Sequence, residues 1–266
     1  MDKVKNAVNL VVSFSNKTLG IAEMEVRKLR HDPTELITRA VQPALWLLIF
    51  GEVFTRLNII STGNLSYLSF ITPGILAQSV LFIAIFYGIA VIWERDLGII
   101  HKFLVSPTPR QALVLGKALS AGIRALSQVV IIYILAVLIG VGINWNPINL
   151  ALVVVVAILA SALFSTFSLI IACLVKTRER FMGIGQILTM PMFFASNAIY
   201  PISMMPRWLQ IVAQVNPLTY AVDALRGLMI TGGVSPYGVG YDLLVLFVVM
   251  IALVLIGAKL YPRVVI

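Results

Sequence analysis

The sequence predicts an all-α integral membrane protein with six transmembrane helices, an N-terminal interfacial amphipathic helix, a short cytoplasmic helix after the second span and two short re-entrant outer helices before the last span. Three observations lead to this prediction. Hydrophobic residues make up 60% of the 266 residues and charged residues only 12%, whereas soluble domains are about half apolar and a quarter charged. Apolar runs of membrane-spanning length recur along the chain. Basic residues gather in alternate segments between these runs.

The spans are located by their length. A hydrocarbon core of about 30 Å needs about 20 apolar helical residues to cross it. Runs that meet this requirement lie at 36–54, 67–93, 115–141, 149–175, 181–200 and 241–260. They place one membrane domain over residues 36–266 and leave residues 1–35 as an N-terminal cytoplasmic and interfacial segment.

Within the N-terminal segment, residues 18–30 have the pattern of an amphipathic helix. Leu19, Ala22, Val26 and Leu29 recur at helical spacing, and most charged residues fall on other faces. The pattern predicts a helix lying along the membrane surface. A solvated helix packed against another protein is the alternative.

The basic residues predict the orientation. Most of the 20 Lys and Arg residues fall in segments that six spans place on the same side as the N-terminus, and the predicted outer segments hold Arg56, Arg207 and Arg226. Because cytoplasmic loops carry an excess of Lys and Arg, both termini are predicted to be cytoplasmic.

The segments 203–215 and 217–230 are helical in pattern but too short to cross the membrane. Asn216 can cap the second helix, with Pro217 at its first position. We therefore expect two short helices that dip in and return. A seventh, broken span is the alternative, but it would move Lys259 and Arg263 to the outside.

Several function classes are excluded by missing motifs. The nearest string to a phosphate-binding loop, "LVLGKALS" at 113–120, lacks the first glycine and the Ser/Thr after the lysine. No hydrolase motif is present, no metal site is expected, and the single cysteine is uninformative. The net charge of +9 is spread over several loops, which argues against nucleic-acid binding.

Few charged residues are expected within the membrane. Glu52 and Arg56 are four residues apart at the outer end of the first span, a spacing that lets them pair. Arg124 lies inside the third span and is expected to extend toward the cytoplasm. An intramembrane charge of this kind is costly and usually functional.

The fifth span contains a polar and kinking cluster. Pro191 removes an intrahelical hydrogen bond, and methionine and phenylalanine residues beside it form an adaptable apolar surface. Ordinary helix packing is the alternative for each residue taken singly. The predicted lining of a translocation path comprises Gln186, Met190, Pro191, Phe193, Phe194 and Asn197.

The loop after the second span, "WERDLGIIHKFLVSPTPR" at 93–110, concentrates charge beside an apolar run. Leu97, Ile100, Phe103 and Leu104 form one stripe at helical spacing. The stripe predicts an amphipathic helix from 94 to 104 that binds the bilayer, its own chain or a partner.

Two motifs now point to a family. "WERDLGIIHKFLVSPTPRQALVLGKAL" (93–119) and "NPLTYAVDALRGL" (216–228) resemble, in the expected order, segments of the type-2 ATP-binding-cassette (ABC) export permeases of the daunorubicin-resistance and polysaccharide-exporter class. The resemblance covers essentially the whole chain. Asp96 stands where glutamate is common, and Ile99-Ile100-His101 replaces the usual T-L-E.

The resemblance implies a permease subunit with no cofactor of its own. ATP and Mg would be bound by a separate ATPase subunit, and a second permease copy, or a close relative, would complete the membrane unit. The implied coupling helix that contacts the ATPase comprises Glu94, Arg95, Asp96, Leu97, Gly98, Ile100, His101, Lys102, Phe103 and Leu104, followed by the loop motif Pro107, Arg110, Gly116 and Lys117. The implied outer re-entrant motif comprises Asn216, Pro217, Tyr220, Asp223 and Arg226.

The expected function is export across a prokaryotic cell membrane, with a drug-like, lipid or other amphipathic cargo and membrane lipid as a further partner. Related permeases of this class also move sugar polymers, so the fold alone does not name the cargo. An ion-gradient-driven carrier or channel is the main alternative and requires a role for Arg124 or Glu52. A membrane anchor that recruits a cytoplasmic complex is the third possibility.

Overall fold

The computed structural model describes residues 41–57, 60, 62–63, 65–99, 110–175 and 177–261. In these residues the regular structure is helical, apart from one isolated bridge between Ile143 and Ile230. Residues 41–45 are also helical and lead into the first labelled element. The elements in chain order are η1 (Trp46–Gly51), α3 (Glu52–Leu57), α4 (Tyr67–Asp96), α6 (Arg110–Leu138), α7 (Pro147–Leu174), α8 (Arg178–Phe194), η2 (Ile202–Met204), α9 (Arg207–Val215), α10 (Pro217–Met229) and α11 (Val239–Leu260).

Four of the described helices, α4, α6, α7 and α11, are long and apolar enough to cross a membrane. They correspond to four of the predicted spans, although α6 begins at Arg110, five residues before the predicted start at 115. The segment 41–57 and α8 correspond to the other two. With 17 residues, α8 is shorter than the about 20 that a full crossing needs. The all-helical class is therefore confirmed, and the count of six spans stays a prediction.

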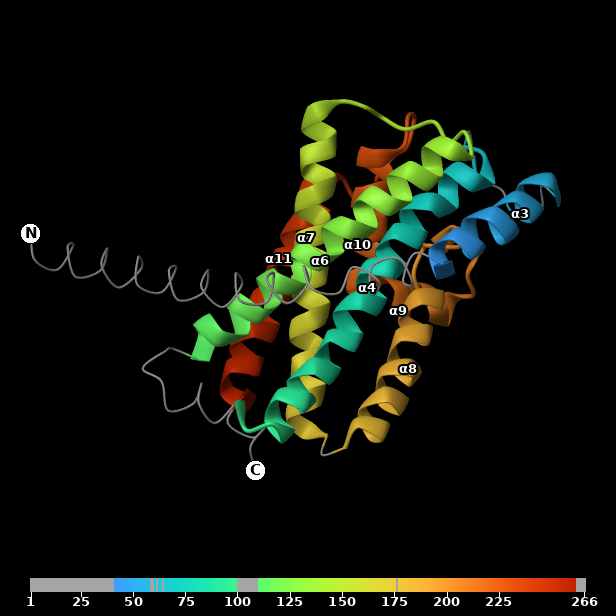
Figure 1. Ribbon diagram of the computed structural model, residues 1–266. Helices are drawn as coiled ribbons and strands as arrows, with labels where there is room; N and C mark the ends of the chain where they lie inside the picture. The colour runs from blue at the N-terminus through green and yellow to red at the C-terminus, as the bar shows by residue number, and fades with distance from the viewer. Residues whose placement is uncertain are drawn as a thin grey trace, which may run out of the picture.

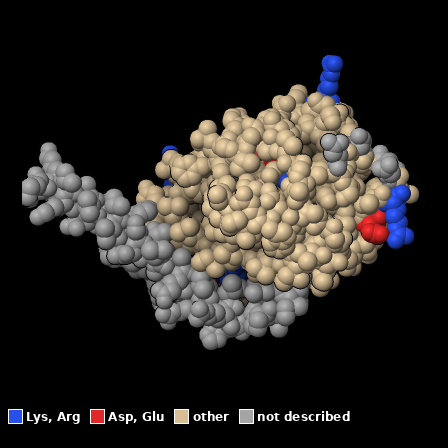
Figure 2. Space-filling model, turned by 90° about the horizontal axis from the view of Figure 1, so that it is seen from above, with Lys and Arg blue, Asp and Glu red and all other residues tan. Residues whose placement is uncertain are grey.

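The helix α7 occupies the centre of the bundle. It packs against α4, α6, α10 and α11, and α8 lies beside α4 on the side away from α11 (Figure 1). The helices α4, α7 and α11 end at the same end of the bundle where α6 and α8 begin. We call this the inner end, following the predicted orientation, and the opposite end the outer end. Figure 2 views the outer end, whose surface shows few charged side chains.

The fifth predicted span is shorter than expected. The helix α8 ends at Phe194, and residues 195–200 form turns in which Ala195 to Ala198 are buried. Gly74 of α4 permits this arrangement, because a Cβ at that position would lie only 2.4 Å from the Ala198 carbonyl oxygen. The apolar run extends past the end of α8 because the turn that follows is itself buried against α4. The predicted span was therefore too long at this end.

The two short helices predicted before the last span are present as α9 and α10, and their re-entrant placement stays a prediction. The Asn216 side chain accepts a hydrogen bond from the Leu218 amide at 3.0 Å and caps α10, with Pro217 at its first position. The same side chain donates to the Met192 carbonyl at 2.6 Å and so attaches the cap to α8. A turn with Gly232 at φ 77° follows α10. The helix predicted at 203–215 is divided into η2 and α9.

Close packing at Gly88 holds α4 against α7 and α8. A Cβ there would lie 2.1 Å from Ser168 Oγ and 2.5 Å from Phe181 Cζ. Ser168 also donates a hydrogen bond across this contact to the Ile85 carbonyl, at 2.5 Å. Small residues at membrane helix contacts permit such close approach.

Replacing Gly88 with alanine is therefore expected to destabilise the fold by about 1–3 kcal/mol, because the added methyl group must displace Ser168 and Phe181. The matched control is Gly183→Ala on α8, where nothing lies within 4 Å of the added Cβ. That variant should be as stable as the native chain or slightly more so, since alanine favours helix. Thermal unfolding of both variants in detergent measures the difference, and equal stability would contradict the close contact.

Candidate functional site

Two buried charged residues meet at the inner end. Lys117 Nζ on α6 lies 2.5 Å from Glu94 Oε2 on α4, and the two side chains are only 4% and 7% exposed. Separating such a pair is costly, because each charge would remain in an apolar environment. The pair therefore fixes the end of α4 against the first part of α6.

A more exposed ion-pair cluster lies next to it. Asp96 accepts hydrogen bonds from Arg178 at 2.9 Å and from Arg95 at 3.1 Å. Arg95 also donates to the Val175 carbonyl at 3.2 Å, and the Arg178 guanidinium lies 3.6 Å from the centre of the Trp93 ring. Arg95 and Asp96 were expected to contact the ATPase subunit, and that contact stays a prediction. In the structure they join α4 to the segment that connects α7 and α8.

The predicted helix from 94 to 104 is not continuous. Glu94, Arg95 and Asp96 form the last residues of α4, and Leu97 is its C-cap. Gly98 follows with φ 71°, a left-handed conformation that commonly terminates helices. The Leu97 side chain is 69% exposed at this point. Glu94, Arg95 and Asp96 therefore belong to α4, and the stripe predicted beyond Leu97 stays a prediction.

The remaining residues of the predicted coupling helix lie outside the described residues. This applies to Ile100, His101, Lys102, Phe103, Leu104 and Pro107, as well as to the helix predicted at 18–30. Of the loop motif, Arg110 begins α6 and Gly116 is buried in it, next to Lys117.

Arg124 lies near the middle of α6 and not near its end. Its guanidinium lies 5.1 Å from the centre of the Tyr87 ring on α4. The Tyr87 hydroxyl lies 3.0 Å from Ser120 Oγ, one turn before Arg124, and Lys117 lies 5.9 Å from the same ring. Arg124 therefore contributes to a contact between two helices, and its extension toward the cytoplasm stays a prediction. Tyr87 thus connects Arg124 with the Glu94–Lys117 pair.

A second buried cluster lies at the outer end. Arg226 Nη1 is 3.4 Å from Asp223 Oδ1, and the two side chains are 6% and 0% exposed. Arg226 also donates to the Asn197 carbonyl at 2.7 Å and lies over the Phe70 ring at 3.9 Å. The Asn197 side-chain amide donates to the same Asp223 carboxylate. The pair holds α10 to α4 and to the turn after α8.

This outer cluster borders a cavity of about 610 Å³. Asp223, Arg226 and Asn197 line it together with Tyr237 of the loop before α11. Partial burial, with the nearby carboxylates of Asp223 and Asp242, raises the pKa of Tyr237 above its usual value. Tyr220 packs its ring against Tyr237 at 5.5 Å and donates its hydroxyl to the Gln214 carbonyl. The sequence identified Tyr220, Asp223 and Arg226 through the motif, and it did not identify their link to Asn197.

The predicted lining of the translocation path divides into two groups. Phe193 and Asn197 are buried within the chain, at 0% and 3% exposure. The other four residues share the exposed surface of α8: Gln186, Met190, Pro191 and Phe194. The six residues therefore do not line one common surface of a single chain.

The remaining charged pair at the first predicted span is a surface feature. Arg56 Nη2 lies 3.0 Å from Glu52 Oε1, and both side chains are at least half exposed. The predicted i,i+4 pair is confirmed. Within the described residues, no group of three His, Cys, Asp or Glu side chains is placed to hold a metal ion.

The comparisons with known proteins assign this arrangement to a family. The model of the ABC-2 type transporter family matches residues 18–230. A putative transport permease, ycf38, from Cyanophora paradoxa is 31% identical over 203 residues, which cover 75% of this chain and 69% of the relative. The daunorubicin resistance ABC transporter permease protein DrrB1 of Streptomyces coeruleorubidus is 26% identical over 75% of this chain and 70% of the relative.

A third relative extends further along the chain. The probable doxorubicin resistance ABC transporter permease protein DrrC of Mycobacterium tuberculosis is 24% identical over 86% of this chain and 82% of the relative. Membership of the family implies a separate ATP-binding subunit as partner. The chain therefore belongs to the ABC-2 type transporter family, as the multi-pass membrane permease subunit of an ABC exporter and not its ATPase.

Proposed function

We propose that the inner end of the bundle receives the ATPase subunit through the segment that follows α4. The observation that carries this proposal is the exposure of Trp93 and Leu97, at 50% and 69%, beside the Asp96–Arg178 ion pair. Exposed apolar side chains surrounded by charge have the composition of a protein interface with an apolar centre and a polar rim. In this proposal Ile100 to Leu104 continue the contact beyond the described residues.

In this proposal the buried Glu94–Lys117 pair connects the ATPase contact to the membrane-spanning helices. A force applied after Asp96 acts directly on the end of α4, and Lys117 transmits it to α6 through a 2.5 Å ion pair. Arg95 and Arg178 connect the same point to the start of α8. Movement of the ATPase would therefore reach three helices together.

We further propose that the translocation path forms between two copies of the chain. Support comes from α8, whose exposed surface carries Gln186, Met190 and Phe194, with Met190 36% and Phe194 44% exposed. A polar side chain beside polarisable and aromatic groups suits an amphipathic cargo. Pairing of two such surfaces would remove them from lipid and enclose a path, with six spans and cytoplasmic termini in each copy. The proposed location is a prokaryotic cell membrane.

The cargo class is proposed from the apolar character of this surface and from the relatives. Two of them are named for resistance to daunorubicin and doxorubicin, which are amphipathic drugs. The test is reconstitution of the chain with its ATPase subunit in liposomes, followed by measurement of ATP hydrolysis and daunorubicin efflux. Transport by the purified chain without any ATPase subunit would contradict the proposal and favour an ion-coupled carrier.

Replacing Leu97 with aspartate is expected to weaken assembly with the ATPase subunit and to reduce ATP-driven efflux at least about tenfold, because a charge replaces an apolar interface side chain. Insertion and stability of the permease should be unchanged, since the side chain is exposed. The matched control is Leu244→Asp on α11, which is 58% exposed on a predicted span and should instead impair membrane insertion. Unchanged co-purification and efflux for Leu97→Asp would remove this residue from the interface.

A further inference from the structure

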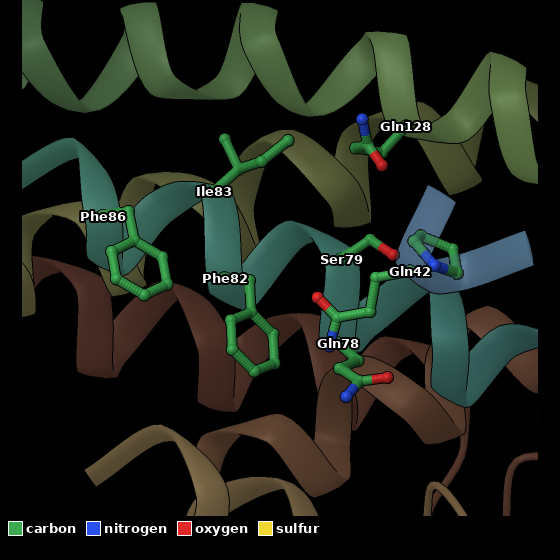
Figure 3. Close-up of a pocket in the computed structure, with 8 residues that line it drawn as sticks. Gln42, Gln78, Ser79, Phe82, Ile83, Phe86 and Gln128 are labelled. Atoms are coloured by element: carbon green, nitrogen blue, oxygen red, sulfur yellow. The ribbon is translucent and has the colours of Figure 1, made fainter. Parts of the chain in front are cut away.

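A polar pocket lies at membrane depth between α4, α6 and the segment 41–45. Its volume is about 240 Å³, and its lining includes three glutamines, Gln42, Gln78 and Gln128, with Phe82 and Phe86 (Figure 3). The two phenylalanine rings stack at 6.1 Å. Amide groups and an aromatic wall thus share one cavity.

The depth of the pocket follows from the helix rise of 1.5 Å per residue. Gln78 lies eleven residues after the first residue of α4, Tyr67, and Gln128 lies ten residues before the last residue of α6, Leu138. Both positions are about 15–17 Å from the outer ends of their helices. That is about half of a hydrocarbon core of about 30 Å. Two independent helices therefore bring amide groups to the middle of the membrane.

The Gln128 side chain is buried without a hydrogen-bond partner among the residues that the structure describes. It is 0% exposed, and neither Nε2 nor Oε1 forms a hydrogen bond with any described residue. Gln78 is 3% exposed, while the hydroxyl of the adjacent Ser79 is satisfied by the Ile75 carbonyl at 2.8 Å. A buried amide without a partner is unfavourable, and polar groups at membrane depth are retained where they serve a ligand or a path.

The chemistry of the lining indicates the class of ligand. None of the lining residues that the structure describes is charged, so these residues offer a ligand no counter-ion. The nearest basic residue on α6, Arg124, lies one turn from Gln128, with its guanidinium directed to the Tyr87 ring, and its charge opposes a cation. An amide both donates and accepts, so it matches a neutral amide or hydroxyl group. The phenylalanine rings accommodate an apolar body.

We propose that this pocket binds the uncharged, hydrogen-bonding part of an amphipathic molecule within the membrane, with Gln128 as the group that recognises it. The volume lies below the about 300–1,000 Å³ of sites that enclose a whole drug-sized ligand. The pocket therefore takes the polar part, and the apolar part extends along Phe82 and Phe86. Treating this molecule as cargo rests on the proposed function, but binding itself does not.

The test uses three photoactivatable probes that share one diazirine-bearing 16-carbon chain and differ in the head: a neutral ethanolamide, a methyl ester without donors and a cationic choline ester. Each is titrated into the permease–ATPase complex in nanodiscs, and the labelled peptides are mapped. We expect the ethanolamide to label the α4 segment around Phe82 and Phe86 at the lowest concentration. Gln128→Leu should raise its half-saturating concentration about tenfold, because two hydrogen bonds are lost at nearly constant volume.

The matched control is Gln214→Leu on α9, an exposed glutamine outside the pocket, which should leave labelling unchanged. If Gln128→Leu does not fold, Phe82→Ala replaces it and should reduce labelling of the same segment. Equal labelling by the ethanolamide and the methyl ester, or labelling that neither pocket variant weakens, would overturn the inference.

Different results would overturn the proposed function and this inference. ATP-driven efflux without Gln128-dependent labelling overturns the pocket alone. Gln128-dependent labelling in a chain that binds no ATPase subunit supports the pocket and overturns the proposed function.

Discussion

Replacing Lys117 with methionine is expected to destabilise the folded permease by about 3–5 kcal/mol, because the Glu94 carboxylate would remain buried without this cation. The two side chains are 4% and 7% exposed, so water would compensate little of the lost interaction. The single cysteine of the chain provides the measurement. Cys173 is buried in the same inner-end apolar cluster as Val91 and Val114, and a thiol-reactive dye reports its exposure on heating. The midpoint should fall by about 6 °C or more.

The control is the double variant Glu94→Gln with Lys117→Met. Removing both charges should recover most of the lost stability, since a buried ion pair often contributes little relative to a neutral pair of similar volume. Arg178→Met provides the second comparison. Its partner Asp96 is 38% exposed, so this variant should lose no more than about 1 kcal/mol. A double variant as unstable as Lys117→Met would show that the methionine, and not the isolated charge, causes the loss.

The same variants test whether the Glu94–Lys117 pair transmits movement from the ATPase subunit to the membrane helices. If the pair transmits movement from the ATPase, the double variant should fold normally and yet hydrolyse ATP with little response to cargo. This outcome would separate the role of the pair in stability from its role in transmission. The double variant regains stability without regaining the ion pair, whereas a single variant loses both.

Local features of the fold were predicted correctly from the sequence. The Asn216 cap with Pro217 and the i,i+4 pair of Glu52 and Arg56 both involve residues within four positions of one another. Helical spacing alone places such residues together. The long apolar helices were located for a related reason, since crossing a membrane fixes a minimum length.

Contacts between distant segments were not predicted. Glu94 and Lys117 are 23 residues apart, and Asn197 and Asp223 are 26 residues apart. Each pair depends on how two helices pack, and periodicity within one helix carries no information on that packing. The motif contained both Glu94 and Lys117 without indicating that they touch. The end of α4 does have a signal in the sequence, since Gly98 follows it and glycine commonly ends a helix.

Replacing Arg226 with leucine is expected to destabilise the outer end by about 3–5 kcal/mol, because Asp223, at 0% exposure, would lose its counter-charge inside the protein. The variant also removes the hydrogen bond to the Asn197 carbonyl and the contact with the Phe70 ring. Hydrogen–deuterium exchange measures the effect by segment. Exchange should increase in α10 and in the turn after α8, while the inner end around Cys173 should change less.

The rescue variant combines Arg226→Met with Asp223→Asn, which removes both charges and keeps an oxygen to accept the Asn197 amide. It should restore slow exchange in α10. The matched control, Arg207→Leu, removes an exposed arginine from the neighbouring helix α9 and should have no effect beyond about 0.5 kcal/mol. Because the Lys117 and Arg226 variants act at opposite ends of α4, local exchange should distinguish them. If both variants increased exchange throughout the bundle, the two ends of the bundle would not open independently.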